Sequence, residues 1–175
     1  VLEDNDKTIG VVSGVLGIRW FDCTVTGMEA HAGPTPMALR KDAMLAATRI
    51  MQDVVAAAHR HPPHGRGTVG MVQVFPNSRN VIPGRVKFSI DLRNSTDELV
   101  DAMAAEVKAF ADQVAKEHGV QVHIEMVSSY PAQLFQPECV EAVGRAAAKL
   151  GYSHMPAVSG AGHHAVYMAK LAPSG

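Results

Sequence analysis

Three stretches of the chain alternate apolar and polar residues with the period of two that a strand with one buried face requires. The first covers residues 20–28, the clearest covers 86–92 and the last covers 120–126. A fourth apolar stretch, 68–75, is also typical of a strand, and the loop after it, 76–84, closes on a Pro-Gly pair that favours a turn. The pattern therefore predicts four strands.

Apolar residues at helical spacing predict two helices between these strands. The first stripe begins at Leu39, after the loop 31–36, and ends before the His-Pro-Pro-His segment 61–64. The second helix is expected to begin at Ser95, which together with Glu98 has the spacing of a capping box, and to end at Gly119, which adopts a left-handed conformation easily. The apolar positions of the two stripes are Ala43, Ala46, Ala47, Ile50, Val54 and Ala57 in the first, and Leu99, Met103, Val107, Phe110 and Val114 in the second.

The order of these elements is β-α-β-β-α-β over residues 17–127. This order predicts an α+β, ferredoxin-like domain in which two helices cover one face of a four-stranded antiparallel sheet. The strand 68–75 would then lie at an edge, and symmetric pairing of two such edges would make a homodimer.

The segment from 128 to 175 does not continue this pattern. Residues 138–150 favour a helix, and 158–164 form a small Gly-rich turn. We therefore expect residues 128–175 to belong to another domain. The abrupt start at Val1 and stop at Gly175 are those expected of a piece cut from a longer protein.

The composition is that of an ordinary globular protein, with 47% hydrophobic and 19% charged residues and a formal charge of -1. This balance gives no attraction to nucleic acid or to an anionic membrane. No apolar run approaches the roughly 20 residues of a membrane span, and the acidic start 1–7 is unlike a signal peptide. Two distant cysteines without a CxxC motif fit a reducing compartment, so a cytoplasmic location is expected.

Three polar side chains stand where they could meet a ligand. His31 lies in a loop among small residues, where it could either face a ligand or cap the following helix. Asn80 could contact a ligand or stabilise its own turn through an Asx hydrogen bond. Arg93, on the polar face of its strand, could bind a carboxylate through two parallel hydrogen bonds, although by itself it is typical of a solvated charge.

Other histidines are less suited to a metal site. His59, His61 and His64 stand among prolines without carboxylates nearby in the sequence, which indicates a solvent-facing loop. His163 follows Ser-Gly-Ala-Gly, whose glycines would let a ligand approach the backbone. No metal ligand is therefore predicted within this chain.

Ten short motifs, in order along the whole chain, together resemble the M20-type amidases of the hydantoinase/carbamoylase family, which includes N-carbamoyl-L-amino-acid hydrolase, β-ureidopropionase and allantoate amidohydrolase. They are Gly10-Val-Val-Ser-Gly, Arg19-Trp20, Val25-Thr26-Gly27, Ala30-His31-Ala32-Gly33, Thr35-Pro36-Met37, Arg40, Asp42-Ala43, Asn80-Val81-Ile82-Pro83-Gly84, Asp91-Leu92-Arg93 and Ser159-Gly160-Ala161-Gly162-His163.

The resemblance implies that residues 17–127 are a lid and dimerisation domain inserted into an α/β catalytic domain, to which 1–16 and 128–175 belong. That catalytic domain would hold two divalent metal ions, zinc or manganese. The resemblance also implies that the lid pairs edge to edge in a homodimer and reaches the partner's active site. His31 would donate a hydrogen bond to the carbonyl oxygen of a small ureido acid. Asn80 and Arg93 would hold its carboxylate, and Gly162 and His163 would contact it from the catalytic domain.

Two departures from the family pattern bear on function. His164 stands where these amidases usually have Asp. The family's metal-binding motifs are absent from residues 1–175, so the segment alone is expected to be inactive and to contain no metal cofactor. Two other functions stay open: the lid of an M20 metallopeptidase, and a stand-alone dimeric module that binds a carboxylate.

Overall fold

The computed structural model describes residues 1–175, which form two compact units. The sheet unit is 18–130, and the terminal unit combines 1–17 with 131–175. Sequence patterning placed the corresponding divisions at 16/17 and 127/128. The assignment of the terminal unit to a catalytic domain stays a prediction.

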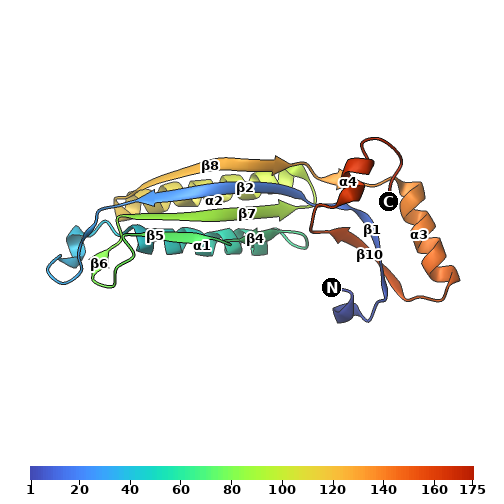
Figure 1. The fold of residues 1–175 in the computed structure, drawn as a ribbon, viewed down its shortest axis with the longest axis horizontal. Helices are drawn as coiled ribbons and strands as arrows, with labels where there is room; N and C mark the ends of the chain where they lie inside the picture. The colour runs from blue at the N-terminus through green and yellow to red at the C-terminus, as the bar shows by residue number, and fades with distance from the viewer. The chain divides into compact units, whose positions relative to one another are not determined.

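The sheet unit contains one antiparallel sheet with four strand positions (Figure 1). Its strands are β2 (Gly17–Thr26), β4 (Arg66–Thr68), β5 (Val72–Phe75), β7 (Arg85–Asn94) and β8 (Gln121–Tyr130). Across the sheet the order is β4 and β5, then β7, β2 and β8. The ferredoxin-like α+β fold expected from the sequence is confirmed.

Helices α1 (Ala43–Arg60) and α2 (Asp97–His118) cover one face of this sheet (Figure 1). The carboxylate of Asp42 caps α1 by accepting from the amides of Met44 and Leu45, which explains why the helix begins after Leu39. The expected capping box at Ser95 is wrong: Thr96 is the N-cap and accepts from the Leu99 amide. Ser95 instead donates its amide to Asn94. Gly119 ends α2 with φ 60°, as predicted.

The core lies between the sheet and the helices. The predicted stripe of α1 is buried in full. In α2 the prediction is only partly right: Met103, Val107 and Val114 are buried, but Leu99 is 40% exposed and the core takes Val100, Ala104 and Ala111. The apolar residues of β2 and β7 that alternate along the strand are buried, whereas those of β8 are only partly buried or exposed. Cys23 is fully buried in this core. Burial raises the pKa of its thiol to about 12, so the thiol stays protonated. The core members are Phe21, Cys23, Val25, Ala43, Ala46, Ala47, Ile50, Val54, Ala57, Val86, Phe88, Ile90, Leu92, Val100, Met103, Ala104, Val107, Ala111, Val114 and Val120.

One buried cation lies on the helix-facing side of β2. Arg19 donates Nε and Nη2 to Asp101 and Nη2 to Asp97, both in the first turns of α2. Its Nη1 donates to the carbonyls of Ile18 and Tyr130, which are paired in the β2–β8 ladder. Burial lowers the pKa of Arg19, but the bonds to Asp101 and Asp97 outweigh it and raise the pKa above its usual value.

The edge strand is interrupted, contrary to the single strand predicted over 68–75. β4 and β5 both pair with β7, and residues 69–71 leave the ladder between them. The Ser89 hydroxyl accepts hydrogen bonds from the amides of Gly70 and Met71 and so replaces regular strand pairing there. Local alternation could not reveal this break, because its cause lies on the neighbouring strand.

The terminal unit contains a small sheet in the order β10–β1–β9. Strand β1 (Ile9–Val15) pairs parallel with β10 (His154–Ser159) and antiparallel with β9 (Gln133–Leu134). Helix α3 (Pro137–Lys149) contacts this sheet, and α4 (His164–Met168) follows the Gly-rich turn. Short 3₁₀ helices occur at Glu3–Asn5 and, in the sheet unit, at Met37–Leu39. None of the helices combines the length and apolar character that crossing a membrane would require.

Candidate functional site

A small two-stranded ladder at one end of the sheet unit brings two of the expected site residues together. Strand β3 (Ala30–His31) pairs antiparallel with β6 (Val81–Ile82), with His31 opposite Val81. The amide of Ala32 donates to the carbonyl of Asn80 at 2.9 Å, which extends the pairing by one residue. We call this region, 28–36 with 76–84, the tip.

His31 lies exposed at the tip with one ring nitrogen engaged. Its Nδ1 accepts a hydrogen bond from the backbone amide of Gly33 at 3.0 Å, and its Nε2 makes no hydrogen bond within the chain. Its carbonyl accepts from the hydroxyl of Thr35 at 2.7 Å. Because His31 lies in a strand and its ring bonds back to its own loop, it does not cap helix α1. An exposed imidazole of this kind can donate from Nε2 to an external oxygen.

Asn80 is exposed beside it, and its side chain is oriented by a neighbour. The Ser78 hydroxyl donates to Asn80 Oδ1 at 3.0 Å. No backbone amide donates to this oxygen, so the Asx turn that was one of the two expectations for this residue is not formed. The side-chain amide N–H groups can serve a ligand that accepts hydrogen bonds.

Arg93 lies near the opposite end of β7 and is not the solvated charge that its position alone suggested. Its Nε and Nη2 donate to the two carboxylate oxygens of Asp91 at 2.9 and 2.6 Å. These hydrogen bonds, partly offset by burial, raise the pKa of Arg93 above its usual value. Only 23% of its side chain is exposed. Asp91 had no role predicted from the sequence, although its spacing of two from Arg93 on one strand face was visible; in the structure it pairs with Arg93.

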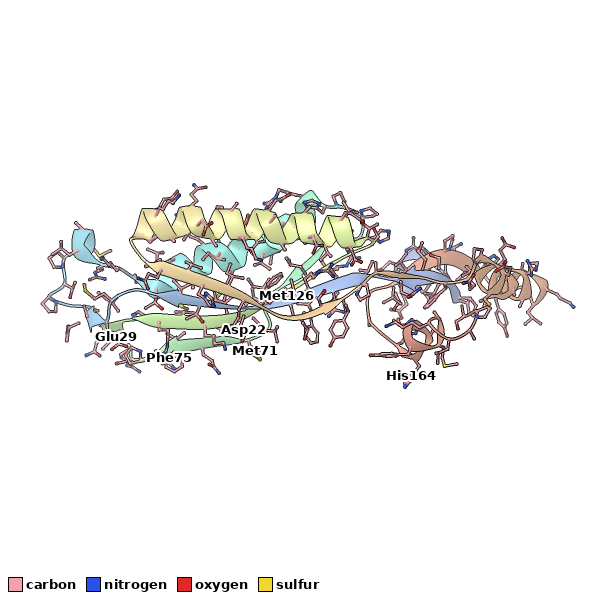
Figure 2. The ribbon with its side chains drawn as sticks, turned by 90° about the horizontal axis from the view of Figure 1, so that it is seen from above. Asp22, Glu29, Met71, Phe75, Met126 and His164 are labelled. Atoms are coloured by element: carbon pink, nitrogen blue, oxygen red, sulfur yellow. The ribbon has the colours of Figure 1, made fainter.

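The structure therefore does not bring His31, Asn80 and Arg93 together within one chain. The tip adjoins the start of β7 at Arg85, and Arg93 lies eight residues farther along the strand. At about 3.3 Å per residue the two ends are roughly 26 Å apart. Figure 2 shows Glu29 and Phe75 toward the tip end of the sheet unit, with Asp22 and Met71 farther along the sheet.

The two expected site residues of the terminal unit stand at the Gly-rich turn. His163 occupies the position before α4, and its ring centroid lies 5.7 Å from that of Phe135. A Cβ built on Gly162 would meet no atom within 4 Å, so packing within this unit does not require glycine there. That open backbone is suited to the approach of a ligand. His164 begins α4 and is exposed.

Of the three histidines expected in a solvent-facing loop, His61 is not free in solvent, because a carboxylate from α2 reaches it. His59 is exposed but lies in the last turn of α1. His61 Nε2 contacts Glu106 at 2.7 Å, and only 17% of the His61 side chain is exposed. Arg60 binds both Glu106 and the buried Asp53. Across all 175 residues, no group of three or more His, Cys, Asp or Glu is placed to hold a metal ion.

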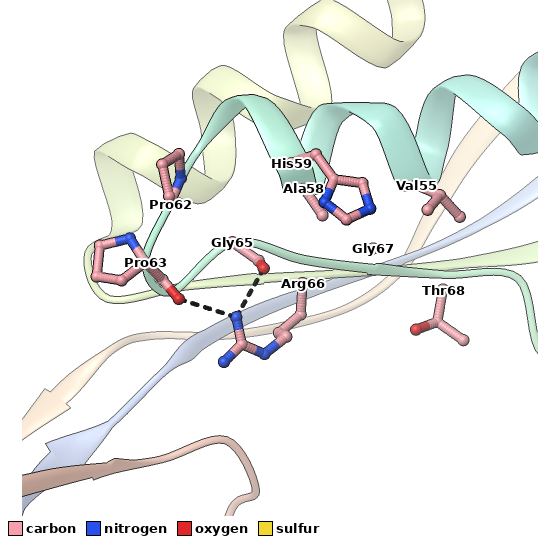
Figure 3. A pocket seen from close by; sticks show the side chains of 9 residues that line it. All are labelled: Val55, Ala58, His59, Pro62, Pro63, Gly65, Arg66, Gly67 and Thr68. Carbon is pink, nitrogen blue, oxygen red and sulfur yellow. Dashed lines mark hydrogen bonds between the residues drawn. The ribbon is translucent and has the colours of Figure 1, made fainter. Parts of the chain in front are cut away.

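A pocket of about 360 Å³ lies beside this segment (Figure 3). His59 lines it, and Arg66 crosses its floor with Nη1 donating to the carbonyls of Pro63 and Gly65 at 3.1 and 2.9 Å. The pocket faces the C-terminal end of α1, where the helix dipole is negative, so it is poorly suited to an anionic ligand. It does not adjoin the tip.

We expect replacement of Glu106 by Gln to lower stability at neutral pH by about 1 kcal/mol at most, because the carboxylate is well exposed and screened. The hydrogen bond from His61, opposed by burial and aided by Arg60, lowers the pKa of Glu106 below 4.5. A carboxylate whose pKa is lowered by folding stabilises the folded protein at pH values above its ordinary pKa. That contribution is lost as the pH falls through the folded-state pKa. The difference in the free energy of unfolding between Glu106→Gln and wild type should therefore shrink below about pH 4.5. Urea unfolding at pH 7 and pH 3 measures it, with Asp112→Asn on the same helix as the control. A difference independent of pH would contradict the ion pairs.

Comparison with known proteins gives one family match. Residues 13–119 match the model of the M20 family described as the peptidase dimerisation domain. Among curated relatives, the chain is 45% identical over 174 residues to N-carbamoyl-L-amino-acid amidohydrolase of Rhizobium meliloti, covering 99% of the chain and 42% of that protein. It is 30% identical over 173 residues to allantoate amidohydrolase of Bacillus subtilis, with the same coverage of 99% and 42%.

The fold is also similar to solved structures. An amidase of the hydantoinase/carbamoylase family from Burkholderia multivorans matches with a TM-score of 0.96 and 47% identity, over 99% of this chain and 42% of that one. The chain thus spans less than half the length of the relatives that it matches.

Proposed function

Because the chain belongs to the M20 peptidase dimerisation domain family, we propose that it is the dimerisation and substrate-clamping segment of a longer amidohydrolase. The proposed reaction is hydrolysis of the carbamoyl C–N bond of an N-carbamoyl-L-amino acid or of a related ureido acid such as allantoate. The names of the relatives support the amidohydrolase assignment over a peptidase. The observation that carries the proposal is the tip, where the β3–β6 ladder brings two exposed residues, His31 and Asn80, to the same end of the sheet unit.

The proposed roles follow from the donors that these side chains offer. His31 would donate from Nε2 to the carbamoyl oxygen and stabilise the negative charge that develops there when the carbon becomes tetrahedral. Asn80 and Arg93 would bind the substrate carboxylate, which fixes the orientation of the scissile bond. The Gly162 backbone and His163 would contribute contacts from the terminal unit.

M20 amidohydrolases are generally metal-dependent. The residues of this chain form no cluster that fits a metal ion. We therefore assign the two divalent ions, zinc or manganese, which would activate the attacking water, to residues of the longer protein. No role proposed for residues 1–175 depends on them, and the isolated chain should not hydrolyse ureido acids.

A site that uses both ends of the sheet needs two chains. Symmetric antiparallel pairing of the β4–β5 edge with its copy would set the Phe75 end of one chain beside the partner's Arg66. Arg66 lies opposite Arg93 in the β4–β7 ladder, and the loop that follows Phe75 carries Asn80. We propose that the tip of one subunit and Arg93 of the other contribute to the same substrate site.

The edge has the features of an interface. Met71, Val72 and Phe75 are apolar and exposed on it. Beside it, between α1 and β4, lies a groove of about 550 Å³ lined by Met51, Gln52, Val55, Gly67, Thr68 and Val69. Unpaired apolar edges favour pairing with another strand.

Replacement of both Met71 and Val72 by Lys should therefore convert the dimer to a monomer, because charged side chains at an edge oppose strand pairing. We expect the dimer dissociation constant to rise at least about 100-fold, which corresponds to about 2.7 kcal/mol. Sedimentation equilibrium measures this change. Val127→Lys on the opposite edge strand, β8, is the control and should leave the dimer intact. Dissociation by Val127→Lys alone would place the interface on β8 instead.

The function is tested by assaying the longer protein with its metal ions against N-carbamoyl-L-amino acids, β-ureidopropionate, allantoate and dipeptides. We expect turnover of at least one ureido acid and none of the dipeptides. Hydrolysis of dipeptides alone would select the metallopeptidase alternative. Tight binding of a small carboxylate by the isolated chain, lost in Arg93→Ala, together with no hydrolysis by the longer protein, would select the stand-alone binding module.

A further inference from the structure

The loop that carries His31 is fixed by more hydrogen bonds than its backbone alone could make. Arg40 donates Nη2 to the carbonyl of Ala32 at 2.6 Å, and Nε and Nη2 to the carbonyl of Thr35 at 3.1 and 3.0 Å. The Thr35 hydroxyl binds the carbonyl of His31, and the Ala32 amide binds Asn80. The planar, forked guanidinium thus holds two carbonyls of the loop at once, which a lysine ammonium would not reproduce.

This arrangement turns the amide of Gly33 toward the imidazole. The amide donates to His31 Nδ1 at 3.0 Å. A nitrogen that accepts a hydrogen bond carries no proton, so this bond assigns the proton of the neutral ring to Nε2. The Nε2–H group then faces outward as a donor.

The identity of residue 33 fits the same geometry. A Cβ built on Gly33 would lie 3.3 Å from both Cε1 and Nδ1 of His31. These contacts are tighter than ordinary van der Waals distances, so a Cβ at this position would make the ring shift by a few tenths of an ångström from the amide. Glycine accommodates the close approach of the ring without that shift.

We infer that Arg40 and the Gly33 amide are positioning groups that hold His31 in the Nε2–H tautomer, so that it acts as a hydrogen-bond donor to the substrate oxygen rather than as a general base. The inference rests on the proposed function for the identity of the acceptor, but the tautomer is a property of this chain alone. A ring free to exchange tautomers would for part of the time present Nε2 to the substrate as an acceptor instead of a donor. The site would then lose the preorganised donor that stabilises negative charge on the substrate oxygen in the transition state.

The tautomer is measured by ¹⁵N NMR of the imidazoles in the chain labelled at histidine, at a pH where the rings are neutral. The His31 signals are assigned by their loss in His31→Gln. We expect Nδ1 to give the shift of an unprotonated nitrogen and Nε2 that of a protonated one. In Arg40→Met and Arg40→Lys both nitrogens should move to intermediate values, whereas the control Arg145→Met, on exposed helix α3, should leave them unchanged. A ring protonated at Nδ1 in the wild type overturns the inference. Unchanged shifts in a folded Arg40→Met overturn the role of Arg40.

Kinetics of the longer protein give the second readout. Arg40→Met should lower kcat by about 10- to 100-fold with little change in KM, because the donor is needed chiefly in the transition state. A wild-type enzyme that hydrolyses no ureido acid would refute the proposed function while leaving the NMR result standing. A wild-type enzyme that is active, with a kcat indifferent to Arg40, would refute this inference alone.

Discussion

Alanine at His31 should lower kcat of the longer protein by about 100- to 1,000-fold, the usual effect of removing one donor to a developing oxyanion. KM should change much less, because the donor acts mainly in the transition state. Alanine at Arg93 should instead raise KM, since a charged contact with the substrate carboxylate contributes to the bound ground state as well. Steady-state kinetics with the best ureido acid separates the two effects. Equal, mild changes in both parameters for both variants would contradict the assigned roles.

Mixing these two variants tests whether the site is shared between subunits. When His31→Ala and Arg93→Ala chains are co-expressed, half of the dimers are mixed in a statistical population. In a mixed dimer, one of the two shared sites combines the intact tip of one chain with the intact Arg93 of the other. At a substrate concentration far below the KM of Arg93→Ala, where each variant alone is nearly inactive, about one quarter of wild-type activity should therefore return.

If both residues served the site of a single chain, every site in the mixed dimer would still lack one of them, and no activity would return. The Met71→Lys, Val72→Lys substitutions, combined with each variant, provide the matched control. They should abolish the regained activity because they prevent edge pairing.

Replacement of Arg19 by Ala should destabilise the chain by about 3 kcal/mol, a large effect for a single polar side chain. Only 8% of the Arg19 side chain is exposed, and its removal leaves Asp97, Asp101 and the carbonyls of Ile18 and Tyr130 without their common donor. The last pair of the β2–β8 ladder and the first turns of α2 then lose their link. A fall in Tm of roughly 10–20 °C is expected for a domain of this size.

The matched control is Arg49→Ala. Arg49 also joins two elements, α1 and α2, through its ion pair with Glu117, but 35% of its side chain is exposed. Solvent screening should limit its effect to about 1 kcal/mol or less. Urea unfolding of both variants compares them directly, and Arg19→Met shows how much of the loss comes from packing rather than charge. An Arg19→Ala cost no larger than that of Arg49→Ala would show that the buried network contributes little.

The order of the elements and most of the faces they bury followed from the sequence alone; the exceptions are Leu99 of α2 and Met126 of β8, which are exposed. Strand alternation identified Phe88, Ile90 and Leu92 as core residues, and the helical stripe identified Ile50 and Val54; all are buried as expected. These patterns are decided by contacts that repeat every two or every three to four residues, so each short segment carries enough information to predict its own element. The same local logic predicted the left-handed end of α2 at Gly119.

What the sequence could not determine depends on residues that are distant in the chain. The Ser89 hydroxyl interrupts the edge strand, Glu106 meets His61 only because α2 packs against α1, and Arg40 reaches back over the loop that carries His31. The separation of Arg93 from His31 and Asn80 is the clearest case. The motifs indicated which side chains could bind a substrate, but the length of β7 decided that they stand at opposite ends of the sheet, because a strand is too stiff and extended to bring its two ends together.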